Sequence, residues 1–405
     1  MMLAEMIENN KLEIFFQPIV SIKNKKVFAF EALLRGYDDE GQILSPVWLF
    51  DQARQEGLSL ILDQLAHMKA IEKFKNYFDK NEKLLLFLNF ESSSIDRDFD
   101  IKPCVIEDKL NELGIPFKNI VIEVKEDEIY NIGYLKDFCQ YYKKLGFNIA
   151  LDDFGTGNSS FDRLSVIAPS IVKIDRSIVS NIHNNYINTE ILKAISKMCE
   201  KIGALVMAEG VESHEEVLEC MNGGIDIYQG YWFARASRLF SGSDRIQQKI
   251  IDLSKDFFEN RDRINESKAN IFEQANDITN KFLNVCMSIE KDKKKKLTEL
   301  INNEKNVEAV YMIDAKTSRQ IGKTIMNVEP CGFYEPSIEG EDHSLKEYVY
   351  MVDISRHSSY ITGQYISGAS GNMCRTFSKK LILNEKEIIF CVDVYEKEKS
   401  IKICA

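Results

Sequence analysis

Histidines and paired cysteines are scarce in this 405-residue sequence, which narrows the chemistry it can carry. None of the five histidines lies in an HxH or HExxH spacing, which argues against a zinc site. The nine cysteines are odd in number and contain no CxxC pair, so we predict reduced, buried thiols and a cytoplasmic location. No apolar run approaches the length of a membrane span, and the acidic, polar start does not resemble a signal peptide. We therefore predict no membrane insertion.

Excess positive charge is also lacking. The formal net charge is −11, which disfavours binding to double-stranded nucleic acid. An acidic protein can still bind a phosphate ester where metal ions reverse the local sign of the charge. Hydrophobic residues make up 44% of the chain, enough for sizeable cores. Because 405 residues exceed one ordinary domain, we expect two domains, one of them long enough for a barrel of about 250 residues.

Apolar strands alternate with amphipathic helices over the first part of the chain. Strands are predicted at 14–20, 27–35, 84–89, 120–124, 147–151, 171–175, 204–209 and 225–229. Helices are predicted at 46–57, 58–74, 104–113, 135–145, 189–202 and 215–222. Strands that are apolar throughout are covered on both faces, which indicates a parallel α/β arrangement. Their number fits an eight-stranded barrel.

Polar residues recur where these strands end, and in such a barrel the ends face one shared pocket. The residues are Glu31, Asn89, Glu123, Asp152, Asp153, Lys173, Glu209 and Gln229, of which five are carboxylates. Five carboxylates in one pocket favour divalent cations with oxygen ligands. Asp152 and Asp153 are adjacent, and they repel each other unless a proton or a cation lies between them. An isolated pair would favour a helix N-cap with a spare acid, but the recurrence of acids at other strand ends favours the cation.

The last part of the chain differs from the first in its composition and residue pattern. Residues 245–301 are charged and helical, with an apolar stripe formed by Ile250, Ile251, Phe257, Ile264, Ile271, Phe272 and Ile278. An apolar helix face needs a partner, so we predict a homodimer. The basic run 293–296 is interpreted as a solvated helix face. From residue 307 a small α+β domain is expected, with strands at 309–313, 348–352, 373–383 and 387–394.

Five short motifs occur in one order along the chain. They are Glu31-Ala32-Leu33 with Arg35, Asp152-Asp153-Phe154-Gly155-Thr156-Gly157, Lys173-Ile174-Asp175, Ala208-Glu209-Gly210-Val211-Glu212 and Gln229-Gly230-Tyr231. Together they resemble the EAL-domain family of cyclic di-GMP phosphodiesterases, over residues 15–233. The resemblance implies a modified TIM barrel with one antiparallel strand. It also implies hydrolysis of cyclic di-GMP to linear pGpG with two Mg²⁺ or Mn²⁺ ions.

The resemblance also implies roles for single residues. One metal would be held by Glu31, Asn89, Glu123 and Asp152, and the second by Asp152, Asp153 and Glu209. Lys173 would contact the attacking water. The expected catalytic residues are Lys173, Glu209 and Glu31. Substrate binding would fall to Gln17, Arg35 and Gln229. Glu126 and Glu212 would brace the Asp153 loop, which in this family connects metal binding to dimerisation.

Three departures from the family pattern stand out, and none removes a ligand. Lys125 replaces the usual threonine, Asn158 replaces an aromatic residue, and 234–237 lacks the usual proline. Alternative interpretations remain for three residues: Lys173 as an interior lysine in a salt bridge, Arg35 as a rim charge, and Gln17 as a structural turn residue. For the whole protein, the alternatives are a receptor that binds the dinucleotide without cutting it and a protein-interaction scaffold.

The order of parts suggests three segments: a barrel at 1–243, a helical connector at 244–303 and a sensory domain at 304–405. This order is similar to the YkuI type of architecture within the family. Arg375-Thr376-Phe377-Ser378, which leads into the last hairpin, has the faint pattern of a PAS- or Cache-like domain. Such domains sense ligands or partners, so a regulatory role is expected for this one.

Overall fold

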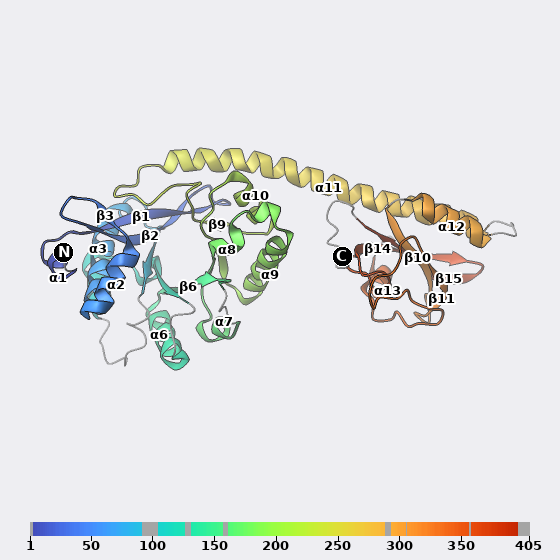
Figure 1. Cartoon of the computed structure of the whole chain (residues 1–405), viewed down its shortest axis with the longest axis horizontal. Coiled ribbons are helices and arrows are strands. Elements are labelled where there is room, and N and C mark those ends of the chain that lie inside the picture. Colours follow the sequence, from blue (N-terminus) through green and yellow to red (C-terminus); the bar gives the residue numbers. More distant parts are fainter. Residues whose placement is uncertain are drawn as a thin grey trace. The chain divides into compact units, whose positions relative to one another are not determined.

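The structure, a computed structural model, describes residues 3–90, 104–125, 131–156, 161–287, 293–304, 306–355 and 358–395. The chain divides into two compact units, 1–259 and 260–405, here called the barrel unit and the C-terminal unit (Figure 1). The division falls inside the long helix α11 (Ser243–Met287). The three-segment division at 243/244 and 303/304 stays a prediction. Among the described residues, no helix combines the length and apolar character that crossing a bilayer requires.

The barrel unit is built on one closed sheet. Its strands are β1 (Leu12–Ser21), β2 (Lys26–Tyr37), β3 (Ile43–Leu44), β4 (Leu85–Asn89), β5 (Ile120–Lys125), β6 (Asn148–Phe154), β7 (Ile171–Ile174), β8 (Leu205–Ala208) and β9 (Ile227–Tyr228). Strand β1 pairs antiparallel with both β2 and β9, which closes a barrel of eight strands. The pairs from β2 through β4 to β9 are parallel, and β3 only extends β2. The predicted barrel with one antiparallel strand is therefore confirmed.

Helices cover this barrel between successive strands. They are α1 (Leu3–Glu8), α2 (Pro46–Glu56), α3 (Ser59–Phe78), α5 (Cys104–Leu113), α6 (Ile132–Leu145), α7 (Phe161–Ile167), α8 (Arg176–Val179), α9 (Tyr186–Ile202) and α10 (His214–Asn222), with short 3₁₀ turns at Phe117–Asn119 and Ile182–Asn184. Local chemistry sets their ends. Ser45 caps α2 by accepting a hydrogen bond from the Trp48 N–H, and Pro46 occupies the first turn. At the other end, Gly57 adopts the left-handed conformation (φ 71°) that ends the helix.

The barrel interior is closed at one level by an apolar plug with one residue from each strand. The plug consists of Ile19, Ala29, Phe87, Val121, Ala150, Ile171, Met207 and Ile227. Side chains alternate between the two faces of a strand, so the residue two positions further on also points into the barrel. The plug therefore forms the floor on which a second layer of inward side chains lies.

The C-terminal unit contains an antiparallel sheet in the order β11-β10-β15-β14-β12. Its elements are α12 (Lys293–Asn303), β10 (Val307–Asp314), β11 (Gln320–Met326), α13 (Glu347–Ile354), β12 (Ser359–Ile361), β13 (Tyr365–Ile366), β14 (Met373–Leu383) and β15 (Lys386–Val394). One apolar cluster joins the sheet to α11 and α12, and a second cluster includes residues of α13. The expected sheet-rich α+β domain is present, while its PAS- or Cache-like identity stays a prediction.

One predicted strand of this unit is wrong. Residues 348–352 lie in helix α13. The run Tyr348-Val349-Tyr350-Met351-Val352 has the aromatic and β-branched composition of a strand. Its buried members, however, are Tyr348, Val349 and Val352, which share one face of a helix and pack beside Tyr311 of β10. Composition alone did not separate the two states, because a short apolar run fits either one.

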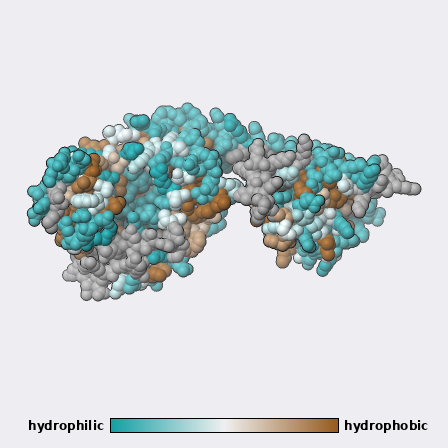
Figure 2. All heavy atoms as spheres, viewed as in Figure 1, coloured by the Kyte–Doolittle hydropathy of each residue, from teal (hydrophilic) through white to brown (hydrophobic). Residues whose placement is uncertain are grey.

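Both ends of the apolar stripe of α11 pack against other residues of the same chain. Ile246, Ile250 and Leu253 are buried in the core of the barrel unit. Ala275, Ile278 and Phe282 are buried in the core of the C-terminal unit. Figure 2 shows mostly hydrophilic residues along the visible side of this helix. The chain itself thus covers both ends of the stripe, and the homodimer stays a prediction.

Two of the described cysteines, Cys286 and Cys331, differ from the prediction of reduced, buried thiols. Cys139, Cys199, Cys220, Cys374 and Cys391 are free and buried, and Cys286 is free and half-buried. Burial raises the pKa of the Cys139 thiol to about 12, which keeps it protonated and unreactive. Cys331, in contrast, is disulfide-bonded, so the prediction is wrong at this position. Disulfide formation depends on proximity in the fold, which the spacing of cysteines along a sequence does not give.

Candidate active site

A layer of polar side chains lies directly above the apolar plug of the barrel. Each residue of the layer stands two positions from the plug residue of the same strand. It follows the plug residue on the parallel strands and precedes it on β1, which runs antiparallel. The layer consists of Gln17, Glu31, Asn89, Glu123, Asp152, Lys173, Glu209 and Gln229. Because side-chain direction repeats every two residues, all eight face the interior of the barrel. The strand register thus brings together eight residues that the sequence had singled out.

Lys173 occupies the centre of this layer. Its Nζ lies 2.5 Å from Glu123 Oε1, 2.9 Å from Asp152 Oδ1 and 2.6 Å from Glu209 Oε1. The lysine is 1% exposed. Burial by itself lowers the pKa of Lys173, but Asp152, Glu123 and Glu209 outweigh it and raise the pKa well above the usual range. Lys173 is therefore an ammonium ion held among carboxylates.

Glu31 is held by two amide donors. Asn89 Nδ2 donates to Glu31 Oε1 at 2.8 Å, and Gln229 Nε2 donates to Glu31 Oε2 at 2.5 Å. These bonds come from β4 on one side and from the end of β9 on the other. The two amides therefore fix the orientation of a carboxylate that faces the pocket.

Asp152 and Asp153 both reach the pocket because the strand is irregular where they lie. Consecutive residues of a regular strand point to opposite faces. The pairing of β6 with β7 shifts register between Leu151 and Phe154, and Asp153 adopts a left-handed backbone (φ 57°). Such a conformation is uncommon for a residue other than glycine and occurs at functional sites. The irregularity turns two successive carboxylates toward one space.

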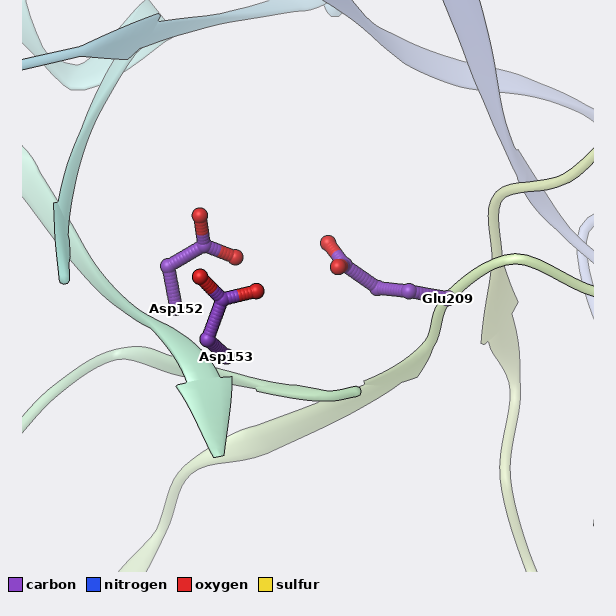
Figure 3. A group of neighbouring side chains, drawn as sticks. All are labelled: Asp152, Asp153 and Glu209. Carbon is purple, nitrogen blue, oxygen red and sulfur yellow. The ribbon is translucent and has the colours of Figure 1, made fainter. Parts of the chain in front are cut away.

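These carboxylates form a set that fits divalent cations. One oxygen each from Asp152, Asp153 and Glu209 lie within 4.8 Å of one another, and Figure 3 shows the three groups facing a common space. Glu123 Oε2 is buried and has no hydrogen-bond partner among the described residues, as a buried metal ligand would in the absence of its ion. Hard oxygen ligands of this kind suit Mg²⁺ or Mn²⁺. The residues present therefore fit the metals that the sequence predicted.

Without a cation, burial and neighbouring charges favour protonation of Glu209, Glu123 and Asp153. Burial raises the pKa of Glu209 to about 8, with Lys173 opposing the rise and Asp152 adding to it. Burial also raises the pKa of Glu123 well above its usual value. For Asp153, burial first and Asp152 second raise the pKa. A bound dication would release these protons, because it favours the charged form of its ligands.

Two cavities meet at the carboxylates. A cavity of about 390 Å³ is lined by Asn89, Lys125 and Asp153 together with apolar residues that include Phe50 and Phe90. A second cavity of about 250 Å³ is lined by polar residues, among them Gln17, Lys173, Arg176, Glu209 and Gln229. Glu31 and Asp152 line both. An elongated ligand could therefore place its middle at the acids and one arm in each cavity.

Three predicted residues, Arg35, Gln17 and Glu212, make contacts that the sequence did not indicate. Arg35 is half-buried; its Nη1 donates to Leu34 O at 2.8 Å, and its guanidinium lies 5.8 Å from the Phe15 ring centroid. Gln17 lines the smaller cavity and donates to Ala234 O at 3.3 Å. Glu212 pairs with Arg176. Glu126 lies outside the described residues, so the bracing role of these two acids stays a prediction.

A comparison with protein families decides the classification. Residues 1–236 match the family model described as the EAL domain. The chain belongs to the EAL-domain family. YkuI of Bacillus subtilis, an EAL-domain containing protein, is 24% identical over 90% of this chain and 90% of its own length. The cyclic di-GMP phosphodiesterase NbdA of Pseudomonas aeruginosa is 28% identical over 58% of this chain, but the match covers only 30% of NbdA.

Solved structures agree with the fold. YkuI in complex with its substrate c-di-GMP and calcium matches 98% of this chain and 100% of its own, with a TM-score of 0.83 and 21% identity. The likeness thus extends through the C-terminal unit and confirms the YkuI type of architecture. BlrP1 of Klebsiella pneumoniae, in a complex with manganese and the cyclic dinucleotide, is 28% identical over 56% of each chain with a TM-score of 0.50.

The EAL domain of this chain also contains polar residues whose role the sequence did not indicate. His67 is buried and contacts the backbone oxygen of Asn89 at 2.7 Å, and Asp63 lies 3.6 Å from the same His67 nitrogen. The i,i+4 spacing of Asp63 and His67 on α3 was visible in the sequence, but it is also common on ordinary helices. In the sequence, Lys125 is distinguished only as a departure from the family pattern. Its ion pair with Asp153, at 3.5 Å, became apparent only in the fold.

Proposed function

We propose that the EAL domain of this chain hydrolyses cyclic di-GMP to linear pGpG with two Mg²⁺ or Mn²⁺ ions, as part of bacterial second-messenger signalling in the cytoplasm. The observation that carries the proposal is the ring of carboxylates around Lys173 at the junction of two cavities. A two-lobed dinucleotide has its phosphodiesters between its two guanosines, which matches acids between two cavities. NbdA is named a cyclic di-GMP phosphodiesterase, and YkuI was solved with the same dinucleotide.

The proposed metal ligands divide into two overlapping sets. Glu31, Asn89, Glu123 and Asp152 would hold one ion, and Asp152, Asp153 and Glu209 the other, with Asp152 shared. The three acids of the second set are those whose oxygens lie within 4.8 Å of one another. When bound, a pair of such ions lowers the pKa of water and neutralises charge on phosphate oxygens. The hydrogen bonds from Asn89 and Gln229 would hold Glu31 in position for the first set.

Lys173 would orient the attacking water. Its ammonium lies among three carboxylates that are themselves proposed metal ligands, so metal ions bound to these oxygens would leave an N–H free to donate to the water. A fixed donor next to the nucleophile lowers the reorganisation that the reaction requires. Glu209 and Glu31 would share the catalytic role through the metals and the water they position. Gln17, Gln229 and Arg35 would contact the substrate.

The C-terminal unit would regulate this activity as a PAS- or Cache-like sensory module, and the chain would act as a homodimer. The buried contacts of α11 in both units support coupling, because one helix belongs to both cores. Glu126 and Glu212 would brace the Asp153 loop and connect it to the dimer interface.

A specific contact supports a second candidate function, a receptor that binds cyclic di-GMP without cutting it. Lys125 Nζ lies 3.5 Å from Asp153 Oδ2, so a cation of the protein already accompanies one proposed ligand of the second ion. The test is incubation of the purified full chain with cyclic di-GMP and Mg²⁺ or Mn²⁺, followed by chromatography of the products. Metal-dependent pGpG supports the enzyme; binding without product under both metals supports the receptor.

A further inference from the structure

Lys125 is placed by its strand to face the metal ligands. It is the last residue of β5 and follows Glu123 by two positions, so it lies on the same face one layer nearer the mouth. Its register partner on β6 is Asp152. Lys125 also lines the larger cavity together with Asn89, Asp152 and Asp153. The ammonium can therefore reach the space where the second ion would lie.

The two lysines of the site form ion pairs with four of its five carboxylates. Lys173 forms ion pairs with Glu123, Asp152 and Glu209. Asp153 is not among these partners and pairs instead with Lys125, at 3.5 Å. The side chains of Lys125 and Asp153 are 42% and 33% exposed, so this pair lies at the wetter edge of the site. A flexible lysine in such a place can be displaced, unlike the buried Lys173.

We propose that Lys125 is a built-in monovalent cation that competes with the second divalent ion for Asp153. The inference rests on the metal sets of the proposed function. An ammonium beside Asp153 neutralises one ligand charge and repels an arriving dication, so it weakens the second site more than the first. The first set lies deeper, since its Glu123 is 1% exposed and forms its ion pair with Lys173, so the first set is affected less. Occupancy of the second site, and with it the choice between binding and cutting, then depends on the free metal concentration.

The test measures Mn²⁺ binding to the full chain without nucleotide, by electron paramagnetic resonance of free Mn²⁺ and by calorimetry. Lys125→Thr is compared with wild type and with Lys144→Thr, which removes the same charge from an exposed position at the end of α6. Lys125→Thr should tighten the weaker Mn²⁺ site by about tenfold and leave the tighter site within about twofold. Lys144→Thr should change neither, and Lys125→Arg, which keeps the charge, should bind like wild type.

Several results would overturn the inference. Equal shifts in Lys125→Thr and Lys144→Thr would mean that only net charge matters. A weak site that stays unchanged or absent in Lys125→Thr would show that Lys125 does not compete. An unchanged weak site with a raised KM for cyclic di-GMP would make Lys125 a substrate contact instead. A different result would contradict the proposed function. If Lys125→Thr binds two ions tightly but hydrolyses no cyclic di-GMP, the enzymatic function is refuted, while competition between Lys125 and the second ion is still supported.

Discussion

Lys173 Nζ and Glu123 Oε1 lie 2.5 Å apart, with both residues 1% exposed. An ion pair buried this deeply is expensive to desolvate, and well-packed apolar residues would give equal or greater stability. Lys173 also forms ion pairs with Asp152 and Glu209, so removing it would take away the cation that these three acids share. The arrangement is better explained by the chemistry of the site than by stability.

Lys173→Ala should abolish most turnover while leaving cyclic di-GMP binding detectable. The variant should also unfold at a lower temperature in chelator, because breaking a buried pair from one side costs about 3 to 5 kcal/mol. Added Mn²⁺ should restore part of the loss, since it replaces the missing positive charge. Thermal unfolding with and without Mn²⁺ measures this, with Lys193→Ala at the exposed pair to Glu190 as the control. Wild-type turnover in a folded Lys173→Ala protein would remove the residue from the mechanism.

Asp152→Asn should reduce metal-dependent hydrolysis about a thousandfold or more. Asp152 is shared by both proposed metal sets, and loss of one transition-state ion costs several kcal/mol at about 1.4 kcal/mol per tenfold. The fold should survive, because Lys173 retains Glu123 and Glu209 as partners. The melting temperature of the variant in chelator should equal or exceed that of wild type, because the substitution removes one negative charge from a crowded set of acids. Product chromatography and melting curves test both points, with exposed Asp137→Asn as control. A variant as active as wild type would contradict the metal assignment.

Asp393 predicts a pH dependence of stability in the C-terminal unit. It is buried, accepts hydrogen bonds from Thr376 Oγ1 at 2.7 Å and Tyr311 Oη at 3.3 Å, and burial raises its pKa from 3.8 to about 7. Between these values the folded state keeps a proton that the unfolded state has lost, so stability falls as pH rises through this window. The free energy of unfolding falls by at most about 4 kcal/mol, and it levels off above the pKa of Asp393 in the folded state.

Asp393→Asn tests this dependence, because the amide preserves the shape and does not titrate. The free energy of unfolding of the variant should vary less between pH 4 and 7 and should exceed that of wild type at pH 8. Glu339→Gln, at an exposed acid of the same unit, should keep the wild-type slope. Identical slopes in Asp393→Asn and wild type would show that Asp393 does not hold its proton.

Removal of the C-terminal unit should leave metal-dependent chemistry but change its rate or the association of the chain. A cut at residue 307 would leave the apolar residues Ala275, Ile278 and Phe282 of α11 without the sheet they pack against. The division of the chain therefore favours a fragment of residues 1–259. Its hydrolysis rate and mass are compared with those of the full chain. A folded fragment that matches the full chain in both would contradict regulation by the C-terminal unit.

The full chain is expected to be a homodimer at micromolar concentration. Both ends of the α11 stripe are covered within the chain, so the expectation now rests on the link between the Asp153 loop and dimerisation that the family suggests. Light scattering gives the mass directly. A monomer mass with and without Mn²⁺ would contradict the prediction.

The sequence by itself determined the strands of the barrel, most of its helices and the chemistry of the site. Each strand of the barrel is an apolar run, and the polar residue near its end stands two positions from a plug residue, as Glu123 does from Val121. This periodicity is a local property of strands, so it can be read without the fold. The ordered motifs then identified the family, which the comparison confirmed.

Only the tertiary structure decided which groups meet. Gln17 lies beside Glu31 because β1 runs antiparallel and closes the barrel, a pairing between distant segments. A backbone irregularity turns the side chain of Asp153 into the pocket. There it forms an ion pair with Lys125, which lies on the neighbouring strand. Tyr348 lies in a helix because its face packs on a sheet formed elsewhere in the chain. In each case the deciding interaction joins residues far apart in sequence, and local patterns carry no information about such contacts.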